Sequence, residues 1–277
     1  MTSAPAKAYS QPMNTQISPN QEAAAVLVSR VNHVALVELC RPPHNFFDMQ
    51  MIKAIADAFE ALEADPSCRS IVLCAQGTSF CAGANFGDSK RELADSPRRV
   101  NPLYFEAIRM FSCSKPVITA VHGPAIGGGL GLALVGDFRV TCKEAKFSAN
   151  FNRLGFHPGF GLSVTLPRLV GVQKAALLFY TGRRVSGDEA FNIGLADILV
   201  AQDQVRSEAI KLATEIAISA PLAVVSTRAT LRRGLVDAIR VAVAHESTEQ
   251  NWQFKTEDFE EGIAAMSARR DPQFRAR

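Results

Sequence analysis

The sequence lacks the long apolar run that a membrane helix needs. No stretch of its 277 residues comes near the roughly 18 consecutive apolar residues that would suggest a membrane span. A strong charge imbalance is missing as well, because the formal net charge is only +3. A charge this small gives no support for nucleic-acid binding. We therefore expect neither a membrane nor a nucleic acid as a partner.

Cysteine and histidine are present, but in no arrangement typical of a disulfide or metal site. The six cysteines include no C-x-x-C pair, and most lie in or beside apolar runs. Cysteines of this kind are typical of reduced core residues, which predicts a cytoplasmic protein. The five histidines show no metal-binding spacing. The sequence therefore predicts no metal site.

A secretion signal is also missing from the N-terminal residues. Residues 1–22 are rich in Ala, Ser, Pro, Gln and Asn, contain one Lys and have no apolar core segment. A composition of this kind cannot bury enough apolar surface to fold. We therefore expect a disordered leader over residues 1–22.

Strand and helix patterns alternate after this leader. Short apolar runs predict strands at 26–28, 34–39, 70–75, 117–121, 138–141 and 146–148. Between them, Asp48 is a helix cap ahead of an apolar stripe of helical spacing over residues 52–62. This alternation predicts an α/β core over residues 23–200.

Beyond about Gly161 the pattern becomes mostly helical. Helices are predicted over 204–219 and 222–233, and Gly234 separates them from one long amphipathic stretch that runs to about Ala268. We assign residues 201–277 to a helical C-terminal region, and we expect this region to pack on a neighbouring subunit. No internal repeat and no linker indicates a separate domain.

Glycine is concentrated where a helix begins. Residues 126–134 read IGGGLGLAL, although glycine costs ~0.5–1 kcal/mol per helix position relative to alanine. One reason to keep these glycines is that bare N–H groups at a helix N-terminus can point at a negative oxygen. The other is tight packing of the helix on a sheet. The residues alone leave both explanations open.

A second turn of small residues follows another buried strand. It reads Phe80-Cys81-Ala82-Gly83-Ala84-Asn85. Turns at the ends of neighbouring strands converge where open α/β folds bind their ligands. Two convergent backbone donors are what an enolate or a tetrahedral oxyanion needs, since one lost donor costs ~2.7–4 kcal/mol of barrier. The two turns therefore predict a pocket that polarises a carbonyl group.

Several further segments accompany the two glycine turns. They are Arg41-Pro42-Pro43-His44-Asn45, residues 79–84, residues 115–118 running into His122-Gly123, the triplet Gly127-Gly128-Gly129, residues 155–161 and residues 257–263. At these residues the chain resembles the crotonase superfamily, the enoyl-CoA hydratase/isomerase family. The resemblance covers roughly residues 25–277.

The resemblance implies a crotonase-like fold, an α/β spiral of ββα units with a helical C-terminal oligomerisation region. It implies a homotrimer or a hexamer built as a dimer of trimers. The partner it implies is an acyl-CoA thioester, so coenzyme A is part of the substrate and no cofactor is bound permanently.

The resemblance also implies roles for individual residues. The oxyanion donors correspond to the N–H groups of Ala84 and Gly128. Residues implied to contact coenzyme A are Arg41, His44, Ala82, Met266 and Arg269, the last two in a tail that reaches a neighbour's CoA. In that tail an arginine keeps the charge that a phosphate requires.

The chain departs from the family's hydratases at both catalytic glutamates. The first glutamate follows the glycine triplet by two residues, where this chain has Gly131; the second corresponds to Phe151. A general acid or base contributes about 10²–10⁴-fold to rate, and neither a glycine nor a phenylalanine transfers protons. Ordinary hydration by a two-glutamate route is therefore not expected.

His157 is the candidate to replace the missing groups. It lies in the loop that, by resemblance, borders the acyl pocket, and a histidine with a pKa near its ordinary ~6.5 suits acid–base work. The alternative is a histidine that is hydrogen-bonded in a structural turn. Aromatic residues near the turns would line an acyl pocket or belong to the core: Phe46, Phe47, Phe86, Phe151, Phe156 and Phe160.

Two functions of different classes follow. The first is an acyl-CoA-processing enzyme that stabilises a thioester enolate or oxyanion and carries out isomerisation, hydrolysis, C–C bond chemistry or atypical hydration. The second is a catalytically silent CoA-thioester binder or assembly subunit that keeps the fold without the acids.

Overall fold

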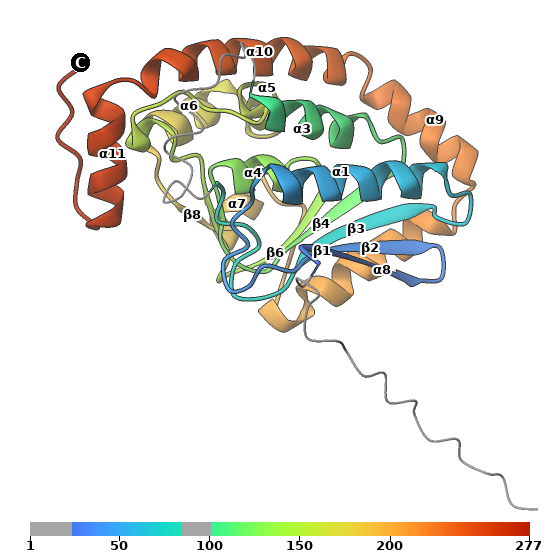
Figure 1. Ribbon diagram of the computed structural model, residues 1–277. Helices are drawn as coiled ribbons and strands as arrows, with labels where there is room; N and C mark the ends of the chain where they lie inside the picture. Colours follow the sequence, from blue (N-terminus) through green and yellow to red (C-terminus); the bar gives the residue numbers. More distant parts are fainter. Residues whose placement is uncertain (1–23, 85–100) are drawn as a thin grey trace, which may run out of the picture.

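The computed structural model describes residues 24–84 and 101–277. The leader expected over residues 1–22 lies outside the described residues, as does Phe86. Strands and helices alternate in the first part of the chain, and helices dominate after it (Figure 1). The mixed α/β architecture expected from the sequence is therefore confirmed.

A mixed sheet of six strands forms the centre of the molecule. Its order is β1-β2-β3-β4-β6-β9. The strands are β1 (Val26–Val31), β2 (Val34–Leu39), β3 (Ser70–Ala75), β4 (Val117–Val121), β6 (Phe138–Cys142) and β9 (Ile198–Val200). β1 pairs antiparallel with β2, whereas the other neighbours are parallel. Strands β2 to β4 are buried almost throughout, which explains their nearly continuous apolar sequences.

A second, smaller sheet lies beyond the ends of the central strands. It contains β5 (Ala125–Ile126), β7 (Lys146–Ser148) and β8 (Val185–Ser186), in that order. β5 pairs in parallel with β7, and β7 pairs antiparallel with β8. Because β5 leads directly into the glycine-rich helix, this sheet fixes where that helix begins.

Helices lie on both sides of the central sheet. The described helices, of which only some contact the sheet directly, are α1 (Met49–Ala64), α3 (Pro102–Ser112), α4 (Gly128–Ala133), α5 (Leu162–Val170), α6 (Val172–Thr181), α7 (Gly187–Asn192), α8 (Val205–Ala217), α9 (Pro221–Leu231), α10 (Leu235–Gln253) and α11 (Glu257–Ser267), with short 3₁₀ turns at η1 (Asn152–Leu154) and η2 (Gln202–Gln204). The cap predicted at Asp48 is present, because its carboxylate accepts a 2.8 Å hydrogen bond from the Met51 N–H.

The helices form layers around the sheet (Figure 1). α1 and α3 pack together on one side, while α8 packs on β2, β3, β4 and β6 from the other. α8 therefore covers the sheet directly, and α9 leads away from it to α10. α10 crosses over α3 and α5, and α11 packs against η1. The end of the chain thus folds back over the middle.

The expected single helix after Gly234 is wrong in one respect. The chain forms two helices there, α10 and α11, and the Thr256 hydroxyl caps the second by accepting the Phe259 N–H at 3.2 Å. The sequence does not reveal this break, because residues 253–257 contain neither glycine nor proline. Within residues 24–84 and 101–277, no single helix is long and apolar enough to cross a membrane; the bent pair Gln202–Ala217 and Pro221–Leu231 meets that requirement only together, with a 106° bend.

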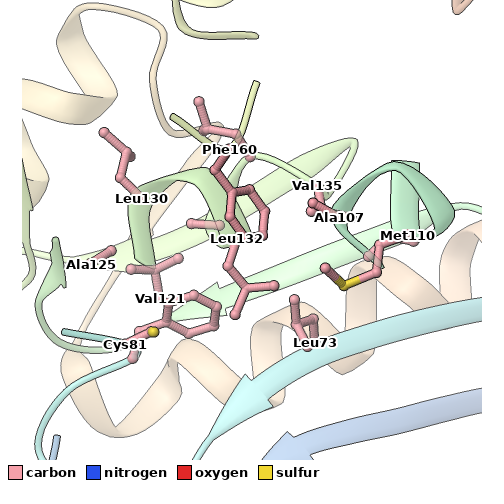
Figure 2. Close-up of a cluster of buried hydrophobic side chains, with 14 of the residues drawn as sticks. Leu73, Cys81, Ala107, Met110, Val121, Ala125, Leu130, Leu132, Val135 and Phe160 are labelled. Carbon is pink, nitrogen blue, oxygen red and sulfur yellow. The ribbon is translucent and has the colours of Figure 1, made fainter. Parts of the chain in front are cut away.

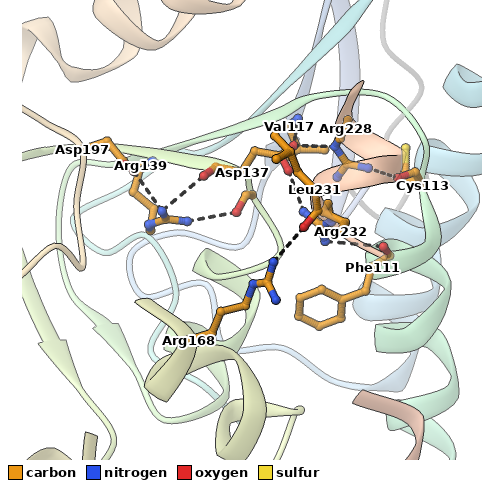
Figure 3. A network of polar contacts seen from close by, with 11 residues as sticks. Phe111, Cys113, Val117, Asp137, Arg139, Arg168, Asp197, Arg228, Leu231 and Arg232 are labelled. Atoms are coloured by element: carbon orange, nitrogen blue, oxygen red, sulfur yellow. Dashed lines mark hydrogen bonds and ion pairs between the residues drawn. The ribbon is translucent and has the colours of Figure 1, made fainter. Parts of the chain in front are cut away.

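An ion-pair network fastens α9 to the core (Figure 3). The Asp137 carboxylate accepts hydrogen bonds from Arg228 Nε at 2.8 Å and from Arg232 Nη1 at 2.7 Å. The same carboxylate accepts the Val117 N–H at 2.9 Å. One side chain therefore connects the beginning of β4 with a helix far along the chain.

Candidate functional site

The two glycine turns meet beside β5. Cys81 donates its N–H to the Pro124 carbonyl and accepts the Ile126 N–H, both at 3.0 Å, and forms a bridge with Ala125. The chain at Gly83 is thereby held against the beginning of α4. A methyl group built on Gly83 would lie 3.6 Å from the Gly128 nitrogen and 3.8 Å from the Gly129 nitrogen. The structure therefore brings together the two turns that the sequence analysis singled out.

The N–H groups of Ala84 and Gly128 are available as donors at this meeting point. Gly128 is the first residue of α4, so its N–H has no acceptor within the helix. Ala84 is bridged to Phe47, but the hydrogen bond there runs from the Phe47 N–H to the Gly83 carbonyl, at 3.0 Å. Neither N–H donates to a group within the described part of the chain.

Each glycine of the triplet has its own structural reason. Gly127 has φ 56°, in the left-handed region that favours glycine. A methyl group on Gly128 would overlap the Phe47 ring, and one on Gly129 would overlap the Cys81 carbonyl. Close packing and accessible N–H groups are therefore both present, so the two explanations left open by the sequence do not exclude each other.

A cavity of about 980 Å³ opens in front of these N–H groups. Its wall includes Ala84 and Gly128 together with residues from α3, η1, α10 and α11. Five of the aromatic residues named from sequence line it: Phe46, Phe47, Phe151, Phe156 and Phe160. The Phe47 and Phe160 rings contact each other, with centroids 5.9 Å apart. An apolar cavity of this size with a few convergent polar groups is typical of a small-molecule site.

Gly131 lies behind the wall of this cavity and does not line it. A methyl group on Gly131 would lie 2.7 Å from Phe160 Cβ and 2.8 Å from Phe160 Cγ and Cδ1. Phe160 thus fills the space that any side chain at residue 131 would need, beside Leu130 and Leu132 of α4 (Figure 2). Phe160 is almost fully buried and has φ 64°, which is unusual for a residue with a side chain.

Phe151 does line the cavity, as part of an aromatic cluster. Its ring meets Phe156 edge to face, with centroids 5.5 Å apart. Phe156 in turn packs on Phe254, the C-cap of α10, and on Phe259 of α11. Residue 151 therefore contributes apolar surface at the position where the resemblance implies a glutamate.

His157 is not among the described residues that line the cavity. Its N–H donates to Gln253 Oε1 at 2.6 Å, and its ring packs against His245 at 5.7 Å. Its Nδ1 lies 2.8 Å from the Pro158 carbonyl oxygen. These contacts match the alternative of a histidine bonded in a structural turn, and they give the acid–base prediction no support.

The residues implied to contact coenzyme A lie in three places. Ala82 and Met266 line the cavity. Arg41 is ion-paired at 2.7 Å with Asp48, a residue of the cavity wall. His44 and Arg269 are exposed, with His44 Nδ1 3.3 Å from the Ser79 hydroxyl.

Titratable groups are few in the described lining: Asp48, Tyr104 and Arg184. Burial raises the pKa of Asp48, but hydrogen bonds from Arg41 and the Met51 N–H outweigh it, so the carboxyl pKa lies below its ordinary value. Burial raises the pKa of Tyr104, whose hydroxyl donates to Gln250 Oε1 at 2.8 Å. With these shifts, neither the Asp48 carboxyl nor the Tyr104 hydroxyl is suited to exchange protons near neutral pH.

Sequence reasoning missed the wall contributed by the last helices. Ser247, Gln250 and Asn251 line the cavity from α10, and Ile263 from α11. Arg184, just before β8, was missed too. Nothing in the local pattern marks these positions, because the face of a helix that borders a cavity is set by how the helix docks.

Two further expectations concern thiols and metals. All six cysteines are free. Burial raises the pKa of Cys81, beside the oxyanion turn, to about 12, which makes this thiol a poor nucleophile. The described residues contain no group of three or more His, Cys, Asp or Glu side chains that could hold a metal ion.

Known proteins share this architecture over nearly the whole chain. A family model described as enoyl-CoA hydratase/isomerase matches residues 29–277. The chain is 33% identical to a crotonyl-CoA hydratase of Syntrophomonas wolfei, covering 90% of this chain and 97% of that protein. It is 35% identical to a putative enoyl-CoA hydratase of Thermus thermophilus, covering 87% and 97%.

Solved structures agree with these sequence relatives. An enoyl-CoA hydratase/isomerase from Pseudoalteromonas atlantica superposes with a TM-score of 0.82 at 28% identity, covering 91% of this chain and all of that one. A carnitinyl-CoA hydratase from Mycobacterium avium superposes with a TM-score of 0.81 at 29% identity, covering 91% and 99%. The crotonase-like fold implied by the sequence is therefore confirmed.

Proposed function

The chain belongs to the enoyl-CoA hydratase/isomerase family, and from that premise we propose that it processes an acyl-CoA thioester by stabilising an enolate or oxyanion. The Ala84 and Gly128 N–H groups would bind the thioester oxygen. The convergence of these two free donors at one apolar cavity carries the proposal. Donors fixed in a dry site stabilise developing negative charge without reorganising.

The described cavity wall argues against ordinary two-carboxylate hydration. It holds a single carboxylate, that of Asp48, which is paired with Arg41. Gly131 and Phe151 provide none, and the Phe160 ring occupies the space beside Gly131. We therefore place the reaction among isomerisation, hydrolysis, C–C bond chemistry and atypical hydration. A catalytic role for His157 remains a prediction: a fully active His157→Ala variant would rule it out.

A silent CoA-thioester binder is the second candidate. It is favoured by the same observation, namely that the described cavity wall holds a single carboxylate and that this carboxylate is ion-paired. A polarised carbonyl still needs a group that moves protons. Binding is expected under both proposals. Turnover is expected only under the first.

The coenzyme A portion has proposed contacts as well. Arg41 and His44 would stand near its entrance, Ala82 near the adenine, and Arg269 near a neighbour's CoA, which would require a homotrimer or hexamer. Met266 lines this chain's own cavity, so it would stand beside the CoA bound there. Exposed apolar side chains on α9 and α10 support such contacts between subunits: Leu222, Leu231, Val241 and Trp252.

The test combines binding with turnover on a panel of acyl-CoA esters that includes crotonyl-CoA. The informative variant is Ala84→Pro, which deletes one N–H donor, with Ala84→Ser as the matched control that keeps it. Loss of one donor should reduce kcat by about 10²–10³-fold, while Ala84→Ser stays close to the unmodified protein. Equal turnover by both variants would contradict the proposed donors, and tight binding without turnover would favour the silent binder.

A further inference from the structure

One loop of the cavity wall is held by side chains from a single helix face. The loop spans residues 157–163, and its Gly159 and Phe160 line the cavity. The side chains are Glu246, Gln250 and Gln253 of α10, here called the α10 ladder. Their spacing of four and three residues places them on one side of the helix.

Glu246 is the strongest member of the α10 ladder. It is fully buried, and its carboxylate accepts the Gly161 N–H at 2.8 Å, the Ser163 N–H at 3.0 Å and the Ser163 hydroxyl at 2.5 Å. These donors lie at the beginning of α5, where negative charge is favoured by the helix dipole. A buried carboxylate is costly unless it is hydrogen-bonded, and three donors satisfy it here.

The other two ladder members hold the beginning of the loop. Gln250 donates from Nε2 to the His157 carbonyl at 2.8 Å, and Gln253 accepts the His157 N–H at 2.6 Å. The loop backbone is therefore held on both sides of Gly159 and Phe160. Such bracketing is needed because Phe160 has φ 64°, a conformation that persists only where the surroundings enforce it.

The position of Phe160 gives this arrangement a functional consequence. Its ring contacts Phe47, and Phe47 in turn covers the Gly128 position that carries one proposed donor. Phe160 also packs on Gly131, one turn further along α4. A carbonyl held at Gly128 would therefore carry its next carbons toward these two rings.

We propose that Phe160 limits the bulk of the acyl group beside the thioester carbonyl, and that Glu246 is the positioning residue that fixes Phe160 there. The proposal rests on the proposed acyl-CoA binding, and it names a substrate class: acyl groups that are slender next to the carbonyl. Phe160 forms the wall, and Glu246 acts only through the loop.

The experiment measures binding, so that it does not depend on turnover. Acetyl-CoA serves as the slender ester and benzoyl-CoA as the bulky one, and each is titrated by calorimetry. Phe160→Ala should improve the benzoyl-to-acetyl affinity ratio by about tenfold or more, since even one methylene in an apolar pocket is worth that much. Glu246→Gln should shift the ratio in the same direction, by a smaller factor.

A double variant distinguishes a positioning role of Glu246 from general destabilisation of the protein. The Glu246→Gln change should add no further shift in a Phe160→Ala background, because the ring it positions is gone. Glu249→Gln is the matched control, because it is the same change on the same helix at a carboxylate that does not bond to the loop and that accepts, among the described residues, one hydrogen bond from Trp252 Nε1 at 3.1 Å. Ser163→Ala offers a milder variant, which removes one donor to Glu246 and should shift the ratio slightly in the same direction.

The outcomes are distinct. A uniform loss of affinity for both esters in Glu246→Gln and Ser163→Ala, with an unchanged ratio, would overturn the role of Glu246. An unchanged ratio in Phe160→Ala would overturn the role of Phe160. Failure of the unmodified protein to bind any acyl-CoA ester would instead refute the proposed function and, with it, this inference.

Discussion

Replacing Gly131 with alanine tests the contact that distinguishes this cavity. The new methyl group would stand 2.7 Å from Phe160 Cβ and 2.8 Å from Cγ and Cδ1. The nearest of these atoms belongs to the stem of the side chain, so the clash cannot be relieved by turning the ring. Overpacking of this kind costs ~1–3 kcal/mol, and alanine recovers ~1 kcal/mol of helix propensity. We expect a net loss of about 0–2 kcal/mol in the free energy of unfolding.

The sign of this effect should reverse when Phe160 is replaced by glycine. Phe160→Gly removes all three close atoms and suits φ 64°. In that background Gly131→Ala should stabilise the protein by up to ~1 kcal/mol. The coupling between the two positions is therefore about 1–3 kcal/mol. Phe160→Gly alone should cost several kcal/mol, because a buried aromatic ring is lost (about 3–5 kcal/mol for Phe→Ala).

Urea unfolding of the four proteins at one protein concentration measures this coupling. Equal concentrations matter because subunit association would otherwise change the apparent stability. If Gly131→Ala changes stability equally in both backgrounds, within about 0.5 kcal/mol, Phe160 does not fill the space beside Gly131. The reasoning would then be refuted.

The same contact predicts how hydration could be introduced. Gly131→Glu with Phe151→Glu restores both carboxylates in sequence, but the Phe160 ring leaves the first no room. We expect crotonyl-CoA hydration only when Phe160→Gly is added. The two-residue variant is the matched control, and equal activity with and without Phe160→Gly would contradict the steric explanation.

Two further expectations follow from the core. Burial raises the pKa of Asp137, but Arg228 and Arg232 outweigh this effect and hold the pKa below its ordinary value. The stability that this ion-paired carboxylate contributes to the fold is therefore complete above about pH 4 and is lost as pH falls through the folded-state pKa. Asp137→Asn should cost ~3 kcal/mol at pH 7 and flatten this acid dependence in pH-resolved urea unfolding. Burial raises the pKa of Cys74 and Cys81 to about 12, so both should resist iodoacetamide at pH 8 until the protein is denatured. Rapid labelling of native Cys81, seen by mass spectrometry, would show that the thiol is accessible and reactive.

The sequence predicted those elements whose signals are local. The runs at β2, β3 and β4 are apolar at all but one position each, and Asp48 precedes a regular apolar stripe, so each could be recognised from neighbouring residues. β5 and β8 have two residues each, too few for any periodicity. The break between α10 and α11 depends on one hydroxyl cap at Thr256, in a stretch that otherwise reads as continuous helix.

The features of the candidate site likewise fall into those that a local segment predicts and those that depend on tertiary packing. The donors at Ala84 and Gly128 could be located because glycine-rich turns after buried strands indicate accessible backbone N–H groups, and such turns are visible in the sequence. The packing of Phe160 over Gly131, and the hydrogen bonds from Glu246 to a distant loop, depend on which helix faces meet. These are tertiary contacts between distant segments, so they cannot be predicted from any one segment of the sequence.

The cavity wall also sets an order for assembly during synthesis. Ala84 and Gly128 contribute to its wall from the first half of the chain, whereas Ile263 and Met266 of α11 contribute to it from near the end. A chain leaves the ribosome from its N-terminus at about 5–20 residues per second. The sheet can therefore fold while the cavity still stands open, with its aromatic wall facing water. A newly made molecule would gain its binding site in one late step, when α10 and α11 dock.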